Sequence, residues 1–297
     1  MLEGGLKDLS ISRPSEKIPW GIPVPGDKKQ TMYVWFEALM NYITTLGYPD
    51  GQDFKDFWPA DVQVIGKDII RFHAIIWPAV LLSLDLPLPR TLYVHGFIKD
   101  ASGETMSKSL GNGIAPNDVV EQYGADAFRY YVTRHIPSGE DNNFAWERYE
   151  TIYNTELANE LGNLVSRTAS MISKYQDGVI GDLPESMHDI APYHDAFEAF
   201  RFDRALEYVW NLVRGLNQYI EDEKPWAIAK AGPDEAEHLR EILAYLVASL
   251  LQVADLLHPV MPSTSAKIIQ MFGDGAVNFE VTQLFPRIHN YTEAPSK

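Results

Sequence analysis

The hydrophobic pattern of this chain changes near Glu150, and that change limits the possible folds more than any other feature. Before it, two short apolar runs at residues 62–65 and 92–95 flank a stretch of helical periodicity at residues 68–82. After it, apolar residues recur at helical spacing over long stretches. Short apolar runs joined by a helix are typical of parallel sheets, and long periodic stretches are typical of bundles. The sequence therefore predicts an α/β domain followed by an all-α domain.

The ends of the two predicted strands are the first place to expect a binding site. Gly66 follows the first strand and Gly96 follows the second. In parallel sheets covered by helices, ligands bind beyond the carboxyl ends of the strands. We therefore expect the chemistry of the first domain near these two glycines.

The other elements can be predicted from turn residues and periodicity. Residues 14–30 are rich in proline and glycine, which predicts a loop and excludes a regular helix or a central strand. A short strand at 32–34 and a helix through Leu39 and Ile43 should follow. A helix is expected at 118–131 and a loop at 137–143. The expected helices of the bundle are residues 148–175, 202–220, 235–257 and 263–272.

Composition excludes several classes of protein. The 297 residues carry a formal charge of -16 and no cysteine, so disulfides and thiolate zinc sites are excluded, and any RNA contact must be local. No secretory signal is recognisable at the N-terminus, and the longest apolar stretch, 244–257, is shorter than the roughly 20 residues that span a bilayer. We expect a globular cytoplasmic protein without membrane contact.

A polar loop with one central lysine follows the second predicted strand. It contains the sequence TMSKS at residues 105–109, with Lys108 at its centre. An ammonium group there can neutralise charge on a phosphate, and the neighbouring hydroxyl and backbone N–H groups can add hydrogen bonds. By itself, however, Lys108 favours an ordinary exposed loop whose lysine keeps it soluble, because isolated short motifs often match by chance.

This loop resembles the KMSKS signature of class I aminoacyl-tRNA synthetases, and other segments resemble the methionine-specific members of that class. The resemblance covers nearly the whole chain. It is carried by GLKDLSISR at residues 5–13, WGIPV at 20–24, MYVWFEA at 32–38, VIGKDIIRFHAIIWP at 64–78 and VHGF at 94–97. It implies a catalytic domain that is the C-terminal half of a Rossmann-like parallel sheet, followed by an anticodon-binding helix bundle.

The resemblance implies a methionine pocket lined by Trp35, Tyr42, Ile69, His73 and Trp77. Ile69, His73 and Trp77 are four residues apart and share a helix face. Periodicity alone also allows an ordinary core with a hydrogen-bonded histidine. Aromatic walls suit methionine because sulfur–aromatic contacts are worth roughly 0.3–1.5 kcal/mol.

The resemblance also implies an ATP site at the strand ends and in the lysine loop. Asp68 would accept hydrogen bonds from the ribose hydroxyls, and Lys108 would be the catalytic cation acting on the phosphates of Mg-ATP. On its own, Asp68 is equally compatible with a residue that stabilises a helix N-terminus. The complete expected ATP-binding set is Gly66, Asp68, His95, Gly96, Ile98, Thr105, Ser107, Lys108 and Ser109.

In the bundle, Asn163, Arg167 and Trp226 match positions with which the family recognises the CAU anticodon of tRNA(Met). Unstacked bases can stack on tryptophan and form hydrogen bonds with asparagine and arginine. Without the resemblance, these would be a polar surface pair and a packing tryptophan. The expected division is 1–104, a partial catalytic domain; 105–149, the signature loop and stem-contact region; and 150–297, the anticodon-binding bundle.

Two departures from the family pattern stand out. Thr105 replaces the usual first lysine of the signature, and no His-x-Gly-His element is present. The family's N-terminal strands and the zinc-binding part of its connective domain are also missing, so we expect a fragment without a metal site. Met1 would be an internal start, a break in an assembled sequence, or the start of one product of a split gene, in which case the N-terminal half would be a partner. The expected activity is methionine activation by ATP and transfer to tRNA(Met). The alternatives are an inactive tRNA-binding module and another class I specificity, such as valine or isoleucine.

Overall fold

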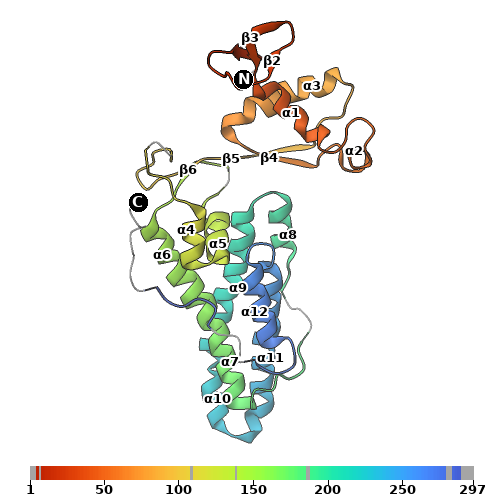
Figure 1. Cartoon of the computed structure of the whole chain (residues 1–297). Helices are drawn as coiled ribbons and strands as arrows, with labels where there is room; N and C mark the ends of the chain where they lie inside the picture. Colours follow the sequence, from red (N-terminus) through yellow and green to blue (C-terminus); the bar gives the residue numbers. More distant parts are fainter. Residues whose placement is uncertain are drawn as a thin grey trace. The chain divides into compact units, whose positions relative to one another are not determined.

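The computed structural model describes residues 5–6, 8–107, 110–137, 139–184, 188–278 and 283–288. The chain divides into two compact units, Met1–Gly96 and Phe97–Lys297 (Figure 1). Each unit has its own hydrophobic cluster and is described by itself. Within the described residues, no helix combines the length and apolar character needed to cross a membrane.

The first unit begins with a small antiparallel sheet that sequence analysis did not predict. Its strands β1 (Ser12–Pro14), β2 (Pro23–Val24) and β3 (Asp27–Met32) have the spatial order β1-β3-β2. The predictions of a plain loop at 14–30 and of a strand at 32–34 are therefore wrong, because β3 is the central strand and ends at Met32. Pro14 lies on edge strand β1 and Pro23 lies on edge strand β2, where a missing N–H is tolerated. Gly26, with a φ of 84°, makes the turn between β2 and β3.

The predicted strand–helix–strand unit is confirmed. Strands β4 (Val62–Gly66) and β5 (Thr91–His95) pair in parallel, with Gly66 opposite His95. The helical connection is irregular: a 3₁₀ turn at Lys67–Ile69 leads into a π-helical turn at Phe72–Ile76 and then into α3 (Trp77–Ser83). Because a π turn holds one more residue than an α turn, it shifts which side chains share a face.

The core of the first unit lies where helix α1 (Val34–Thr44) packs against this helical connection. Its buried residues are Leu39, Ile43, Trp58, Trp77 and Leu81. A short helix, α2 (Gln52–Phe57), precedes Trp58. The helix predicted through Leu39 and Ile43 is thus confirmed, and both residues face the core.

The second unit opens with a small parallel pair, β6 (Ile98–Lys99) and β7 (Asn142–Asn143), and with two short helices, α4 (Pro116–Tyr123) and α5 (Ala125–His135). The single helix predicted at 118–131 is wrong, because Gly124 adopts a φ of 86° and ends α4. Glycine enters this left-handed region at little cost, so the chain can change direction between the two helices.

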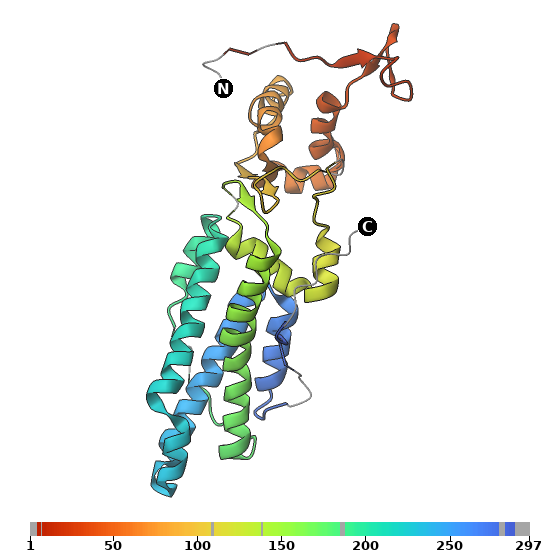
Figure 2. The same ribbon diagram turned by 90° about the vertical axis from the view of Figure 1, so that its left-hand side faces the viewer.

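The rest of the second unit is a helix bundle, as predicted. A continuous helical run from Trp146 to Gln176 combines α6 (Trp146–Ile152), a π-helical segment (Tyr153–Gly162) and α7 (Asn163–Gln176). Helices α7, α9 and α11 pack against one another, and α12 packs on α11 (Figure 2). Their bounds are α9 Phe202–Glu223, α11 Ala236–Leu257 and α12 Pro262–Phe272. Sequence analysis missed two short helices, α8 (Ala191–Glu198) and α10 (Pro225–Ala231).

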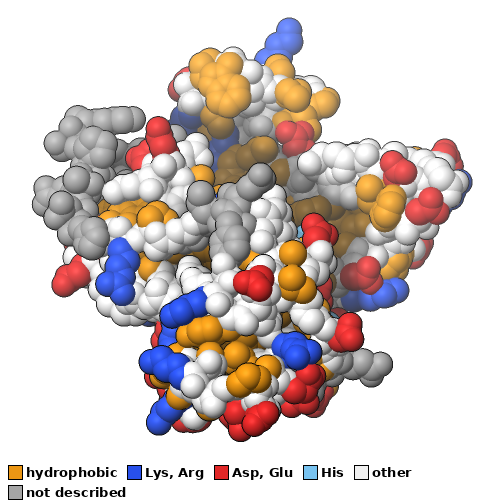
Figure 3. All heavy atoms as spheres, turned by 90° about the horizontal axis from the view of Figure 1, so that it is seen from below, with side chains coloured by type: hydrophobic (Ala, Val, Ile, Leu, Met, Phe, Trp, Pro, Cys, Tyr) orange, Lys and Arg blue, Asp and Glu red, His pale blue; other side chains and the backbone are white. Residues whose placement is uncertain are grey.

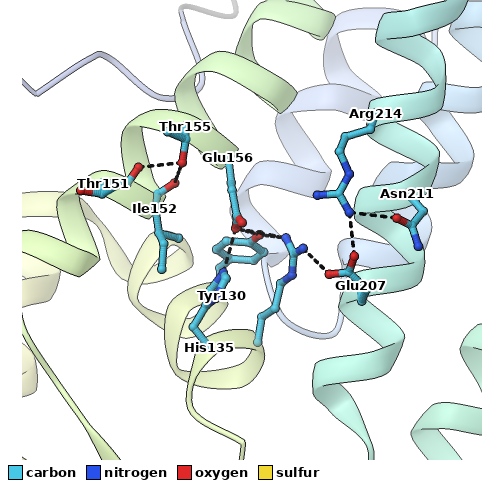
Figure 4. Close-up of polar contacts among 10 residues, drawn as sticks. Tyr130, His135, Thr151, Ile152, Thr155, Glu156, Glu207, Asn211 and Arg214 are labelled. Carbon is cyan, nitrogen blue, oxygen red and sulfur yellow. Dashed lines mark hydrogen bonds and ion pairs between the residues drawn. The ribbon is translucent and has the colours of Figure 1, made fainter.

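A buried charged network joins α5 to the bundle (Figure 4). Glu156 Oε2 accepts hydrogen bonds from Tyr130 Oη at 2.5 Å, Arg134 Nη1 at 3.1 Å and His135 Nε2 at 2.8 Å. Arg134 Nη2 donates to Glu207 Oε2 of α9 at 2.5 Å. Burial by itself would raise the pKa of Glu156, but the hydrogen bonds from His135 and Tyr130 outweigh it and hold that pKa below its ordinary value.

Candidate functional site

Gly66, Asp68, His95 and Gly96 come together where β4 and β5 end. A Cβ at Gly66 would lie 2.6 Å from Asp68 Oδ1 and 3.6 Å from His95 Cε1, so a larger residue there would displace the Asp68 carboxylate. Asp68 and His95 are exposed. His95 Nδ1 lies 3.0 Å from the Gly96 carbonyl oxygen, which can only accept, so Nδ1 carries the proton. The four residues therefore form an open polar edge.

Three of the expected pocket residues contact one another through their side chains. Tyr42 Oη lies 2.9 Å from His73 Nε2, and His73 Nδ1 lies 3.0 Å from the carbonyl oxygen of Ile69. Because that carbonyl can only accept, Nδ1 of the neutral imidazole donates, and Tyr42 donates its hydroxyl proton to Nε2. The Tyr42 ring also lies 5.9 Å from the Trp77 ring. Burial raises the pKa of Tyr42, so its hydroxyl keeps the proton that it donates.

These aromatic residues differ in their access to solvent. Trp77 is fully buried and packs edge-on against Trp58 at 5.9 Å between ring centroids. His73 is 3% exposed, whereas Tyr42 is 37% exposed. Trp35 is half-buried and stacks on Phe72 at 4.7 Å. Of these residues, Tyr42 and Trp35 are therefore accessible to solvent, whereas His73 and Trp77 are buried.

The lysine loop is anchored by residues to which sequence analysis gave no role. Thr105 forms an isolated antiparallel bridge with Lys99, at the end of β6. Asp100 and Asn112 are joined by a hydrogen bond of 2.7 Å, and Ser107 N–H donates to Asn112 Oδ1 at 2.9 Å. Lys108 and Ser109 lie outside the described residues. Ile98 lies in β6 and is 40% exposed.

In the bundle, the structure brings Arg167 and Trp226 together. The Arg167 guanidinium carbon lies 5.9 Å from the Trp226 ring centroid, and its Nη2 forms an ion pair of 2.6 Å with Glu221. Trp226 lies in the first turn of α10, because Lys224 ends α9 in a left-handed conformation and Pro225 begins α10. Asn163 is exposed at the start of α7, one turn before Arg167.

The surface seen from the α10 end of the bundle carries lysine and arginine side chains interspersed with acidic ones (Figure 3). Such a mixed surface offers local contacts to a nucleic acid rather than a broad basic field. Among the described residues, no group of three or more histidine, aspartate or glutamate side chains is arranged to hold a metal ion.

Two protein families match the chain in sequence. The family described as "tRNA synthetases class I (M)" matches residues 1–169, and the family described as "Anticodon-binding domain of tRNA ligase" matches residues 186–294. The first match contains the open polar edge, the aromatic group and the lysine loop. The second contains Trp226 but begins after Asn163 and Arg167.

Similar proteins cover nearly the whole chain. The methionine–tRNA ligase of Enterococcus faecalis is 40% identical over 98% of this chain and 48% of its own length. That of Streptococcus pyogenes is 43% identical over 92% of this chain and 43% of its own length. A crystal structure of Mycobacterium tuberculosis methionyl-tRNA synthetase bound by methionyl-adenylate superposes with a TM-score of 0.84 at 35% identity, covering 96% of this chain and 61% of that one. The chain spans about half the length of the curated relatives that it matches.

Proposed function

The chain belongs to the class I methionyl-tRNA synthetases, and on that premise we propose that it contributes the ATP loop, the methionine pocket and the anticodon surface of an enzyme that charges tRNA(Met) in the cytoplasm. In the first step, the methionine carboxylate attacks the α-phosphate of the substrate Mg-ATP and releases pyrophosphate. In the second step, a ribose hydroxyl at the tRNA terminus takes the methionyl group from the adenylate. Such a reaction needs positioning and charge stabilisation more than covalent help from the protein.

The observation that carries the proposal is the Tyr42–His73–Trp77 group. Tyr42 donates to a histidine that is itself held by the Ile69 carbonyl, so the hydroxyl is fixed beside aromatic rings. A methionine side chain is apolar and polarizable and gains sulfur–aromatic contacts in such surroundings. On this proposal Trp35, which is half-buried against Phe72, contributes a further aromatic side chain to the pocket.

ATP would bind at the open polar edge of the first unit. The Asp68 carboxylate accepts hydrogen bonds from the ribose hydroxyls, and Gly66 leaves room for the sugar. His95, Gly96 and Ile98 approach the adenine. Lys108 is the cation that neutralises charge developing on the phosphates in the transition state. Around it, Thr105, Ser107 and Ser109 supply further hydrogen-bond donors.

The tRNA anticodon would bind at Asn163, Arg167 and Trp226. Trp226 offers a face on which an unstacked base can stack, and Arg167 lies beside that face. The contact is local, which suits a chain with a net charge of -16. On this proposal, residues 1–104 belong to the catalytic domain, 105–149 contain the signature loop and stem-contact region, and 150–297 bind the anticodon.

Catalysis would also need the part of the relatives' length that this sequence does not span. Two elements of the proposal depend on it: the His-x-Gly-His phosphate signature of the class and the strands that complete the parallel sheet beside β4 and β5. We therefore propose that the active enzyme includes a segment that carries these two elements, on the same polypeptide or on a separate one.

The test is exchange of labelled pyrophosphate into ATP by this chain mixed with the N-terminal half of a relative. Methionine, norvaline and isoleucine are compared at saturating ATP. Exchange that requires methionine supports the proposal, whereas exchange driven equally by isoleucine indicates another class I specificity. If the mixture binds tRNA(Met) and supports no exchange, the chain is an inactive tRNA-binding module.

A further inference from the structure

Asp100 organises the turn that leads into the lysine loop. Its Oδ1 accepts hydrogen bonds from the backbone N–H groups of Ser102 at 3.0 Å and Glu104 at 2.9 Å, and from Ser102 Oγ at 2.7 Å. The backbone N–H of Asp100 in turn donates to the Glu104 carbonyl at 2.9 Å. Gly103 takes a φ of 87°, which closes the turn. The carboxylate is thereby fixed, with Oδ2 left to face the far end of the loop.

Asn112 occupies that far end, and its contacts determine how its amide is oriented. Nδ2 donates to Asp100 Oδ2 at 2.7 Å and to the Thr105 carbonyl at 3.4 Å. Oδ1 accepts from the Ser107 backbone N–H at 2.9 Å. A carboxylate and a carbonyl can only accept and a backbone N–H can only donate, so the flipped amide would lose all three contacts. One side chain after the loop thus binds three residues before Lys108.

The electrostatics of this pair make it a charge-assisted contact. Hydrogen bonds from the Ser102 hydroxyl, from Asn112 and from the Glu104 backbone lower the pKa of Asp100 to about 2. The carboxylate is therefore ionised at any pH at which a synthetase is assayed. Hydrogen bonds to a charged acceptor are shorter and stronger than those between neutral groups.

We propose that Asp100 and Asn112 form a latch that ties Thr105 and Ser107, on one side of Lys108, to Asn112 on the other side, and that both are positioning residues for the phosphate chemistry. The inference rests on the proposed function, because it gives the loop its role in adenylation. Neither side chain needs to touch ATP. The latch joins described residues on the two sides of Lys108, and in a second contact the Leu110 N–H donates to Ser107 Oγ at 3.2 Å.

The polarity of the latch allows a reciprocal exchange of its two residues. Asp100→Asn, keeping Oδ1 on its backbone donors, points an NH₂ group at the NH₂ group of Asn112. Asn112→Asp points a second carboxylate oxygen at Asp100. The double variant Asp100→Asn/Asn112→Asp restores a donor facing an acceptor, with the direction reversed, and keeps Oδ1 on the Ser107 N–H. Only the long contact to the Thr105 carbonyl is lost.

The experiment measures methionine-dependent pyrophosphate exchange by the chain complemented with an N-terminal half. Each single variant should lower kcat by about tenfold to a hundredfold, as expected when a catalytic group is slightly misplaced, and should leave KM for methionine unchanged. The double variant should recover kcat to within about threefold of the wild type. Matched controls are Asp274→Asn and Asn117→Asp, exposed positions that should leave kcat unchanged.

Hydrogen exchange supplies a readout that does not depend on activity. In the chain alone, the amides of Ser102, Glu104 and Ser107 should exchange faster in both single variants and regain protection in the double variant. The melting temperature should be the same in all of them. Single variants with unchanged kcat, or a double variant no better than the worse single one, would overturn the latch.

The Lys108→Ala variant distinguishes failure of the latch from failure of the proposed function. If that variant loses exchange while the latch variants keep it, the latch is wrong and the proposed function stands. If Lys108→Ala itself keeps full exchange, the phosphate role of the loop is wrong, and the latch has no catalytic consequence.

Discussion

Replacing Arg134 with methionine should lower the free energy of unfolding of the second unit more than replacing an exposed charged residue would. The Arg134 side chain is 6% exposed and lies between two carboxylates, with Glu156 at 3.1 Å and Glu207 at 2.5 Å. Methionine keeps the length and the apolar stem, so the change removes the charge and its hydrogen bonds and leaves little cavity.

The size of the effect follows from what remains around the carboxylates. Removing one partner of a buried ion pair costs about 3–5 kcal/mol. Glu156 would keep its hydrogen bonds from Tyr130 and His135, and Glu207 would keep Arg214 at 2.7 Å. We therefore expect the free energy of unfolding to fall by an amount at the lower end of that range, about 3 kcal/mol. For a unit of this size each kcal/mol shifts the melting temperature by about 2–4 °C, so the loss should be about 6–12 °C.

The assay is urea and thermal unfolding of the whole chain, followed by far-ultraviolet circular dichroism. Arg240→Met is the matched control, because Arg240 pairs with Glu237 on an exposed face of α11 and surface pairs contribute about 0–1 kcal/mol. If Arg134→Met lowers the free energy of unfolding no more than Arg240→Met does, the buried network does not stabilise the unit and the reasoning is refuted.

The pH dependence of the free energy of unfolding supplies an independent check. Glu156 has a lowered pKa in the folded chain, so its contribution is fully present above the unfolded pKa and is lost as pH falls through the folded one. Without Arg134 the pKa of Glu156 is lowered less, so the stability that this group loses with falling pH should be smaller, and the loss should end at a higher pH. The stability difference between wild type and Arg134→Met should shrink once the pH falls below the ordinary range of glutamate.

Three predictions concern the proposed sites. Tyr42→Phe should raise KM for methionine about tenfold, because buried His73 loses its donor, and steady-state exchange kinetics measure it. Asp68→Asn should raise KM for ATP and leave KM for methionine unchanged in the same assay; a shift in both would contradict a ribose role. Trp226→Ala should weaken tRNA(Met) binding about tenfold in filter binding, since stacking on one base is worth about 1–3 kcal/mol, and should not change pyrophosphate exchange.

Sequence analysis succeeded where hydrophobic periodicity and the fold agree. The strand–helix–strand unit around Gly66 and the helices of the bundle were predictable, because apolar residues repeat there with the period of their element. The antiparallel sheet at β1–β3 was missed, since its prolines and glycines signal turns more strongly than its short strands signal pairing. The single helix predicted at 118–131 included Gly124, because one glycine is tolerated within a helical pattern.

The side-chain networks could not be predicted, because their members come from distant segments. Arg134 and Glu156 are 22 residues apart, and Glu207 is a further 51 residues along the chain. Nothing local marks them as partners, since each occupies a position where an exposed charge would be equally compatible with the pattern. Sequence analysis gave no role to Asn112, and Asp100 becomes informative only once the turn at Gly103 brings the two side chains together.

The most direct test of the proposed function is methionine-dependent pyrophosphate exchange by the chain complemented with an N-terminal half, with Lys108→Ala compared against Lys55→Ala on exposed helix α2. The account predicts that Lys108→Ala lowers kcat by about 10²–10³-fold, as expected for loss of a transition-state cation, while Lys55→Ala has no effect. Equal activity of the two variants, or no exchange although the halves associate, would contradict it.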